Sequence, residues 1–299
     1  MENSPLISVL IPTLDRLPLF KRALGSVLAQ SYPNFEIVVS DNCSTDGTRS
    51  FLESLSISNM RWWTNEARLS MDENWSKCLE RSFGSYFLLL SDDDELLPDA
   101  LTILMTSLRA NLLNIVYGKI HIENKLYCKV HVGTGQVSSE SIADFTIGYF
   151  NGGRLVYPSA TLIERNYVNL TYPAVGTSTD IAMILGSDVK TIVGSVDTSV
   201  AVYRVHESNL SNHLTSQESL IRLIDWHRGL NIFGTNLILD YRTILNGSIE
   251  SWIMNRIISR AFLEGLRGLR YLDGNYLTKL FTALKILLKL TILLLRKSY

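Results

Sequence analysis

The 299-residue sequence contains few cysteines and almost no net charge, and each shortage excludes a class of protein. The three cysteines, Cys43, Cys78 and Cys128, are odd in number and lack the spacing of metal ligands, which is typical of free thiols in a reducing compartment. Because 28 Lys and Arg residues stand against 29 Asp and Glu residues, and no basic segment is interleaved with aromatic residues, we expect no nucleic-acid partner.

Long apolar runs without charges are also absent, so no segment is predicted to cross a membrane. The first apolar run, Leu6–Ile11, follows Glu2 rather than a basic segment and is too short for a signal peptide. We interpret it as a first strand. The length of the chain leaves room for one large domain, or for a domain with an added subdomain, and for a sizeable core.

The stretch Phe87-Leu-Leu-Leu-Ser-Asp-Asp-Asp-Glu-Leu-Leu-Pro98 is the centre of the functional prediction. Its apolar run is typical of a strand buried on both faces of a parallel sheet, which places the three aspartates at the carboxyl end, where open α/β sheets bind ligands. Adjacent carboxylates repel one another unless a cation neutralises them, and oxygen ligands favour Mg²⁺ or Mn²⁺ over zinc. A solvated acidic turn that caps the next helix is the alternative.

Strands and helices alternate through the first 112 residues, which predicts a parallel sheet with right-handed crossovers. The predicted strands cover residues 6–12, 35–40, 60–63 and 87–90, and the predicted helices cover 18–28, 46–55, 71–81 and 98–109. Beyond Leu113, short alternating segments predict a mixed or antiparallel sheet. Its expected strands are 115–118, 119–122, 127–130, 159–164, 189–193 and 199–203, with helices at 139–150 and 181–185. The last third is predicted to be helical.

Two further predicted strands end in acids, in the segments Ile11-Pro-Thr-Leu-Asp-Arg16 and Val38-Val-Ser-Asp-Asn-Cys-Ser-Thr-Asp-Gly47. The carboxyl ends of parallel strands meet at one edge of a sheet, so these acids are expected to converge with the three aspartates. We interpret Asp46 and Gly47 as a helix cap and a turn.

These three motifs, with Tyr203-Arg-Val-His206 as a weaker fourth, resemble those of the family 2 glycosyltransferases over about residues 5–212. The resemblance implies an α/β fold of GT-A type, with a Rossmann-like mixed sheet flanked by helices, here followed by a helical C-terminal extension. It also implies transfer of a sugar from a nucleotide-diphosphate donor to an acceptor hydroxyl, with inversion and with a divalent metal. The Gln-x-x-Arg-Trp motif of processive synthases is absent, which favours one sugar per encounter.

The resemblance assigns roles to individual residues. Those expected to bind the donor nucleotide are Pro12, Thr13, Asp15, Arg16, Asp41, Asp92 and Arg204. Those expected to bind Mn²⁺ or Mg²⁺ are Asp93, Asp94 and His206. Asp180 matches the catalytic base.

Elementary chemistry agrees with these roles, because attack on the anomeric carbon requires a carboxylate near the acceptor hydroxyl and a cation near the departing diphosphate. Asp180 is separate from the metal cluster and begins a helix, although an acid favoured by the helix dipole would look the same. Asp41 also suits a turn, Arg204 suits an ion pair, and His206 suits a strand-end histidine satisfied by a neighbour.

Near the C-terminus, the segment 276–297 combines a wide apolar surface with a narrow face that bears Lys279, Lys285 and Lys289. This pattern is typical of an interfacial membrane helix, but a helix packed on its own domain would look similar. We expect a protein of the cytoplasm, peripheral on the cytoplasmic face of the inner membrane, that uses a glycan or lipid-linked glycan acceptor in the biosynthesis of a surface polysaccharide such as O-antigen or capsule.

The expected organisation is a nucleotide-sugar-binding half (1–112), an acceptor-binding half of the same domain (113–213) and the helical extension (214–299). Two other functions compete. A nucleotidyltransferase would need a glycine-rich basic loop after the first strand, and residues 12–16 contain no glycine. A non-catalytic relative that binds nucleotide sugars or partner enzymes as a membrane scaffold would not need the acids of the Asp92–Asp94 cluster or Asp180.

Overall fold

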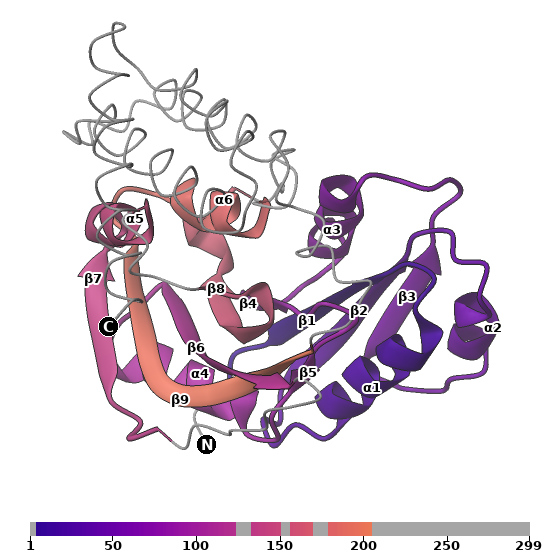
Figure 1. Ribbon diagram of the computed structural model, residues 1–299, viewed down its shortest axis with the longest axis horizontal. Helices are drawn as coiled ribbons and strands as arrows, with labels where there is room; N and C mark the ends of the chain where they lie inside the picture. Colours follow the sequence, from indigo (N-terminus) through magenta and orange to yellow (C-terminus); the bar gives the residue numbers. More distant parts are fainter. Residues whose placement is uncertain (1–3, 124–132, 151–155, 170–178, 205–299) are drawn as a thin grey trace, which may run out of the picture. The chain divides into compact units, whose positions relative to one another are not determined.

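The computed structural model describes residues 4–123, 133–150, 156–169 and 179–204 (Figure 1). Apart from most of helix α5 (Ile142–Phe150), these residues belong to one compact unit, while α5 belongs to a second unit and is described by itself. The predicted strand at 127–130, His206, the predicted division at 213/214 and the segment 276–297 lie outside the described residues.

A nine-stranded mixed sheet forms the centre of the compact unit, with the order β3-β2-β1-β4-β8-β6-β9-β5 and with β7 paired to β9. The strands are β1 (Ile7–Thr13), β2 (Phe35–Asp41), β3 (Met60–Thr64), β4 (Tyr86–Leu89), β5 (Glu95–Leu96), β6 (Ile115–Glu123), β7 (Val137–Ser141), β8 (Thr161–Glu164) and β9 (Ile192–Arg204). Strands β1 to β4 are parallel, as the alternation of strands and helices predicts. All seven residues of β1 are buried, which fits a strand covered on both faces.

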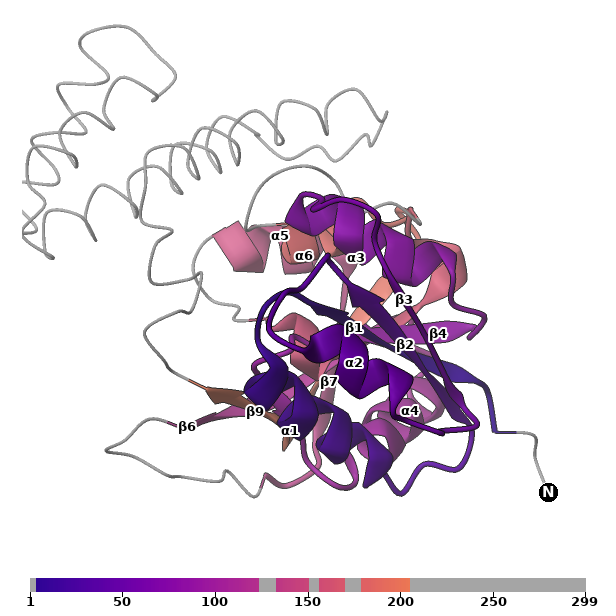
Figure 2. The ribbon, with the colours of Figure 1, turned by 90° about the vertical axis from the view of Figure 1, so that its right-hand side faces the viewer.

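Helices cover the two faces of this sheet (Figure 2). Helices α1 (Leu17–Leu28) and α4 (Ala100–Ala110) lie on one face, where Phe20 and Leu104 join a core with Val9 and Ile37. Leu52 of α2 (Thr48–Glu53) belongs to the same core. Helices α3 (Met71–Glu80) and α6 (Thr179–Leu185) lie on the opposite face.

Local capping explains where the first helices begin. Asp46 accepts hydrogen bonds from the backbone N–H of Leu17 at 2.7 Å and of Thr48 at 3.1 Å, so that one carboxylate caps both α1 and α2. Burial raises the pKa of Asp46, but its hydrogen bonds lower it more, so the net effect is a lowered pKa. Ser70 and Glu73 form a reciprocal capping box at the start of α3.

The second half of the sheet differs from the prediction in the number and the bounds of its strands. Residues 115–118 and 119–122 form the single strand β6, and residues 189–193 and 199–203 contribute to the single strand β9, because β6 and β9 pair in parallel along their lengths with bulges near Gly118 and Lys119. The predicted helix at 139–150 begins only at Ile142, since residues 137–141 pair with β9 as β7. Pairing with β9, rather than an alternating apolar pattern, holds this polar segment in a strand.

Strand β9 connects the far side of the sheet to the aspartates. It curves across the unit in Figure 1, and its end pairs with β5, which directly follows Asp94. The register places Glu95 opposite Val202 and Leu96 opposite Ala201. The pairing therefore brings Arg204 beside Asp94, which lies 110 positions earlier in the chain.

Candidate active site

The acid-bearing ends of β1, β2 and β4 lie at one edge of the sheet, as the sequence predicts. Thr13 at the end of β1 is in register with Asp41 at the end of β2, and Asp41 is in register with Thr64 at the end of β3. After β4, the N–H of Leu90 still donates to the carbonyl of Leu10 at 2.9 Å, so the next residues leave the sheet beside β1.

Asp92 binds the loop that follows β1. Its Oδ2 accepts from the hydroxyl of Thr13 at 2.8 Å, and its Oδ1 accepts from Nη1 of Arg16 at 3.1 Å. The same Nη1 of Arg16 lies 2.7 Å from Oδ2 of Asp93. Burial raises the pKa of Asp92 to about 6, although the Arg16 guanidinium lowers it in part. Arg16 thus pairs with two of the three aspartates and supplies one positive charge to them.

Asp94 binds the other side of the sheet. Its Oδ2 accepts from the hydroxyl of Ser159 at 2.6 Å, and its Oδ1 accepts from the backbone N–H of Arg204 at 3.4 Å. Burial, with the neighbouring charges of Asp93 and Asp92, raises the pKa of Asp94 to about 7. The cluster therefore joins the parallel half of the sheet, through Asp92, to the 3-10 helix before β8 and to the end of β9, through Asp94.

The chemistry of the cluster fits a hard divalent cation. Asp92, Asp93 and Asp94 are each at most 9% exposed and offer only oxygen ligands, the kind that Mg²⁺ and Mn²⁺ prefer. A bound cation would relieve the repulsion and desolvation that raise two of their pKa values. Within the described ranges, however, no three acidic, histidine or cysteine side chains are grouped to hold a metal ion. The metal role of Asp93 and Asp94 stays a prediction.

Two of the residues predicted to bind the donor nucleotide, Asp15 and Asp41, belong to a second network. Asp15, at φ 50°, accepts from the N–H of Thr45 at 2.7 Å and pairs with Arg68 at 2.5 Å, and its pKa is lowered chiefly by the Thr45 bond. Asp41 accepts from the N–H of Ser44 at 3.1 Å and has no exposed surface. Its turn-forming role is therefore present, and its contact with the donor nucleotide stays a prediction.

Pro12 and Arg204 have structural partners as well. Pro12 lies within β1 opposite Ser40. The guanidinium of Arg204 pairs with Glu95 at 2.7 Å and also with Glu123. The ion-pair role of Arg204 is thus present, and its contact with the donor nucleotide stays a prediction.

Sequence reasoning missed several residues that hold the site in place. The side chain of Asn42 forms two hydrogen bonds, both 2.9 Å, with the backbone of Leu69, and its Oδ1 lies 3.2 Å from Nδ2 of Asn65. Asn65 also donates to Asn74 at 2.8 Å. This amide network fixes the loop after β3 against the end of β2. Single asparagines in loops carry no signal for such long-range pairing.

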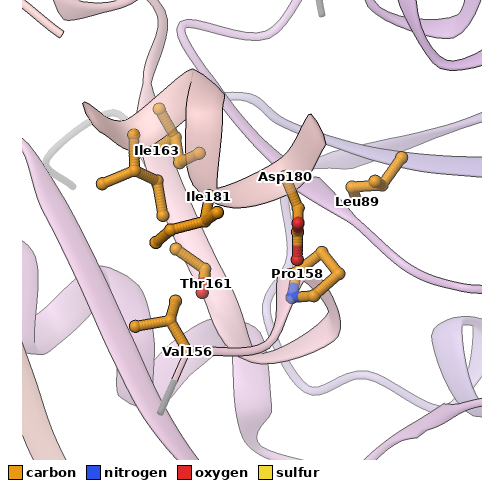
Figure 3. A pocket seen from close by; sticks show the side chains of 8 residues that line it. Leu89, Val156, Pro158, Thr161, Ile163, Asp180 and Ile181 are labelled. Atoms are coloured by element: carbon orange, nitrogen blue, oxygen red, sulfur yellow. The ribbon is translucent and has the colours of Figure 1, made fainter. Parts of the chain in front are cut away.

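Asp180 begins α6 beside a pocket that is otherwise almost entirely apolar. The pocket is lined by Asp180 together with Leu89, Val156, Pro158, Thr161, Ile163, Ile181 and Ile184. Figure 3 shows the Asp180 carboxylate directed toward Pro158, with Leu89 nearby. Leu89 ends β4, three positions before Asp92, so the predicted base lies near the strand end that carries the aspartates.

The electrostatics of Asp180 match a proton acceptor. Burial raises its pKa to about 6, while backbone N–H groups at the start of α6, including that of Ile181, lower it in part. Asp180 therefore interacts with the N–H groups at the start of its helix, as the alternative interpretation predicts, and it also lines the pocket. A carboxylate with this pKa is ionised at pH 7 and is a stronger base than an exposed aspartate.

A pH dependence follows from the raised pKa of Asp180. With Asp180 as the base, kcat for sugar transfer should increase about tenfold per pH unit below pH 6 and should level off above it, because only the ionised carboxylate accepts a proton. The measurement is kcat at saturating donor between pH 4.5 and pH 8, which reports the ionisation in the bound complex. A flat profile between pH 5 and pH 7 would contradict the assignment.

The strand order, the acidic edge and the mixed second half define a class of fold, that of the GT-A glycosyltransferases. Staphylococcus aureus TarS residues 1–349, in complex with UDP-GlcNAc, superpose with a TM-score of 0.66 at 14% identity over 89% of this chain and 81% of that one. The mannosyltransferase PcManGT from Pyrobaculum calidifontis, in complex with GDP-Man and Mn²⁺, superposes with a TM-score of 0.54 at 16% identity over 96% and 88%. At these identities the likeness shows the fold alone, and it confirms the predicted fold class.

Residues 8–127 match the model of the family "Glycosyl transferase family 2", and this part of the chain belongs to that family. The chain is 29% identical over 171 residues to a GalNAc(5)-diNAcBac-PP-undecaprenol beta-1,3-glucosyltransferase of Campylobacter jejuni, which covers 55% of each protein. It is 34% identical over 111 residues to the abequosyltransferase RfbV of Salmonella typhimurium. The matched region covers 34% of this chain and 32% of that protein. The chain thus spans about half the length, or less, of these relatives.

Proposed function

We propose that the protein transfers a single sugar from a nucleotide-diphosphate donor to an acceptor hydroxyl, with inversion and with the help of Mn²⁺ or Mg²⁺. One observation carries the proposal: the acids at the ends of β1, β2 and β4 share one edge of the sheet, and a separate carboxylate with a raised pKa, Asp180, lies in an apolar pocket at the end of β4. Two carboxylate environments of different polarity suit two chemical roles.

In the proposed mechanism, the chain's own residues bind the donor and move one proton. Thr13 and Arg16 hold the aspartates beside the first strand, and Asp180 accepts the proton of the acceptor hydroxyl as its oxygen attacks the anomeric carbon. The glycosyl–phosphate bond breaks on the opposite face, and its electron pair leaves with the diphosphate. A bound divalent cation would supply the positive charge that stabilises this leaving group. The apolar walls around Asp180 keep water away from the attacking side.

The acceptor and the location of the protein belong to the same proposal. The names of the Campylobacter relative and of the Escherichia coli enzyme WfgD, 27% identical over 119 residues, specify glycans on diphosphoundecaprenol. We therefore propose a lipid-linked glycan acceptor in surface-polysaccharide biosynthesis, with the segment 276–297 attached to the cytoplasmic face of the membrane. Among the residues that the structure describes, no helix is long and apolar enough to cross a membrane.

A thermal-shift experiment tests the donor class. The protein is heated with UDP, GDP, dTDP, CMP or ATP, each with and without Mn²⁺. One nucleoside diphosphate should raise the Tm in the presence of Mn²⁺, because a ligand at a hundred times its Kd stabilises the folded state by about 2.7 kcal/mol. The Tm should shift less for the same nucleotide with EDTA.

Two outcomes would oppose the proposal. No shift with any nucleotide would favour the scaffold alternative, which should also fail to hydrolyse a donor slowly in the absence of acceptor. A shift with ATP alone would favour a nucleotidyltransferase.

A further inference from the structure

Two tyrosines from distant parts of the chain form an aromatic pair beside the aspartates. The ring centroids of Tyr157 and Tyr203 lie 5.4 Å apart, with an angle of 50° between the rings. Tyr157 precedes the 3-10 helix Pro158–Ala160, and Tyr203 lies near the end of β9. Both are half-buried, and Tyr157 packs against the main core. The pair therefore offers aromatic surface on a rigid support.

The neighbours of each tyrosine bind the same acid. Ser159, two positions after Tyr157, donates to Asp94, and the backbone N–H of Arg204, next to Tyr203, also donates to Asp94. Val156 and Pro158, on either side of Tyr157, line the pocket of Asp180. Within four consecutive residues, the segment 156–159 thus contacts the Asp180 pocket and the acid cluster. Tyr157 therefore belongs to a segment that connects the pocket of the proposed base to the acid cluster of the proposed donor site.

The order of the strands indicates which substrate the pair faces. Most of the residues predicted to bind the nucleotide lie in or directly after strands β1 and β2, on one side of β4, while Asp92 follows β4 and Arg204 lies in β9. Tyr157 precedes β8 and Tyr203 belongs to β9, and both strands lie on the other side of β4. Most of the predicted nucleotide contacts and the tyrosine pair therefore lie on opposite sides of β4, and the pair lies on the side of the Asp180 pocket, which includes Thr161 and Ile163 of β8.

We propose that Tyr157 and Tyr203 form an acceptor shelf, an aromatic surface that packs against the pyranose ring of the acceptor sugar. This proposal rests on the proposed function and deepens it. The C–H face of a pyranose is apolar and packs on an aromatic ring, while its hydroxyl groups hydrogen-bond with neighbouring polar groups, including the tyrosine hydroxyls. Tyrosine suits such a surface because it supplies a large, rigid and amphipathic contact at a low entropy cost.

The shelf is tested by separating the KM for the acceptor from the KM for the donor. The probes are octyl glycosides of glucose, galactose, GlcNAc and GalNAc, used with the nucleotide sugar that the wild-type protein turns over. Tyr157→Ala and Tyr203→Ala should each raise the acceptor KM about tenfold, with a smaller change in the donor KM. Tyr157→Phe and Tyr203→Phe keep the ring, so their acceptor KM should stay within about threefold of the wild-type value.

Controls make each result decisive. Phe83→Ala removes an aromatic ring that is 74% exposed in the turn before β4, and should leave both KM values unchanged. If an alanine variant fails to fold, Tyr157→Leu fills the same packing volume without a ring and should raise the acceptor KM to the same degree. An unchanged acceptor KM overturns the shelf, and so does an equal rise in the donor KM, which would place the donor sugar on the tyrosines. Absence of donor turnover in the wild-type protein would instead refute the proposed function.

Discussion

Asp180→Asn should lower the rate of sugar transfer at least a hundredfold and should leave donor binding close to that of the wild-type protein. The substitution keeps the size and hydrogen-bonding shape of the side chain but removes the proton acceptor, and general-base catalysis typically contributes about 10² to 10⁴ in rate. The carboxylate lies in the pocket with Leu89 and Pro158, apart from the aspartates that are expected to bind the donor. The measurements are kcat for transfer and the Kd of the nucleoside diphosphate.

The matched control is Asp188→Asn, which changes an exposed acid just beyond α6 and should retain full activity. If Asp180→Asn transfers sugar at the wild-type rate, another residue is the base. If it loses donor binding instead, Asp180 belongs to the donor site.

The same substitution should not destabilise the protein above pH 6. Burial raises the pKa of Asp180 from 3.8 in the unfolded chain to about 6, so the folded state binds the proton more tightly. The stability that this proton provides is present below about pH 4 and is lost as the pH rises through 6. Asparagine cannot ionise, so the variant should have an equal or higher Tm at pH 7. Lost activity with retained stability would separate a catalytic role from a structural one.

The parallel half of the sheet was predictable because its signals are local. The predicted strands are rich in apolar residues and most of them end in turn-forming or acidic residues, and parallel strands necessarily present these ends at one edge. Asp41 and Asp92 therefore lie where the sequence places them, and Asp46 caps a helix as expected. The strand β7 was not predictable in this way, since its residues Val-Ser-Ser-Glu-Ser form a strand only through pairing with β9.

The hydrogen-bond partners of the site residues could not be predicted from the local sequence either. Asp94 is held by Ser159, 65 positions later, and by Arg204, 110 positions later. Arg16 was expected to contact the nucleotide, and in the structure its guanidinium binds Asp92 and Asp93. Sequence identifies residues with suitable chemistry at a strand end, but only the register of β8 and β9 decides which of them meet.

The ion pairs of Arg16 with Asp92 and Asp93 affect how a cation and a donor would bind. Its guanidinium already supplies one positive charge to Asp92 and Asp93, at 3.1 and 2.7 Å. Burial lowers the pKa of Arg16, but the two carboxylates raise it more, so the net effect is a raised pKa. The guanidinium therefore keeps its charge. A divalent cation at Asp93 would compete with Arg16 for the carboxylate, and a guanidinium released from Asp93 would be able to bind the anionic diphosphate. Cation and diphosphate should therefore bind cooperatively.

Asp93→Ala should remove most of the metal-dependent part of nucleotide binding, with the Kd for the nucleoside diphosphate in Mn²⁺ rising more than tenfold toward its value in EDTA. The carboxylate that Arg16 and the cation would share is absent in this variant, while the bond from Arg16 to Asp92 remains, so the protein should fold with a similar Tm. Isothermal titration calorimetry with and without Mn²⁺ measures the two Kd values. Asp94→Asn, compared in the same way, shows which two of the three aspartates act on the metal.

The control for this measurement is Asp99→Asn, an exposed acid at the start of α4 whose side chain makes no capping hydrogen bond, and it should bind as the wild-type protein does. If Asp93→Ala binds the nucleotide in Mn²⁺ with unchanged affinity, Asp93 is not a metal ligand. If affinity in EDTA falls as far as affinity in Mn²⁺, the effect of Asp93 acts through Arg16 and the loop after β1. The two Kd values thus distinguish a carboxylate that holds the cation from one that only positions the arginine.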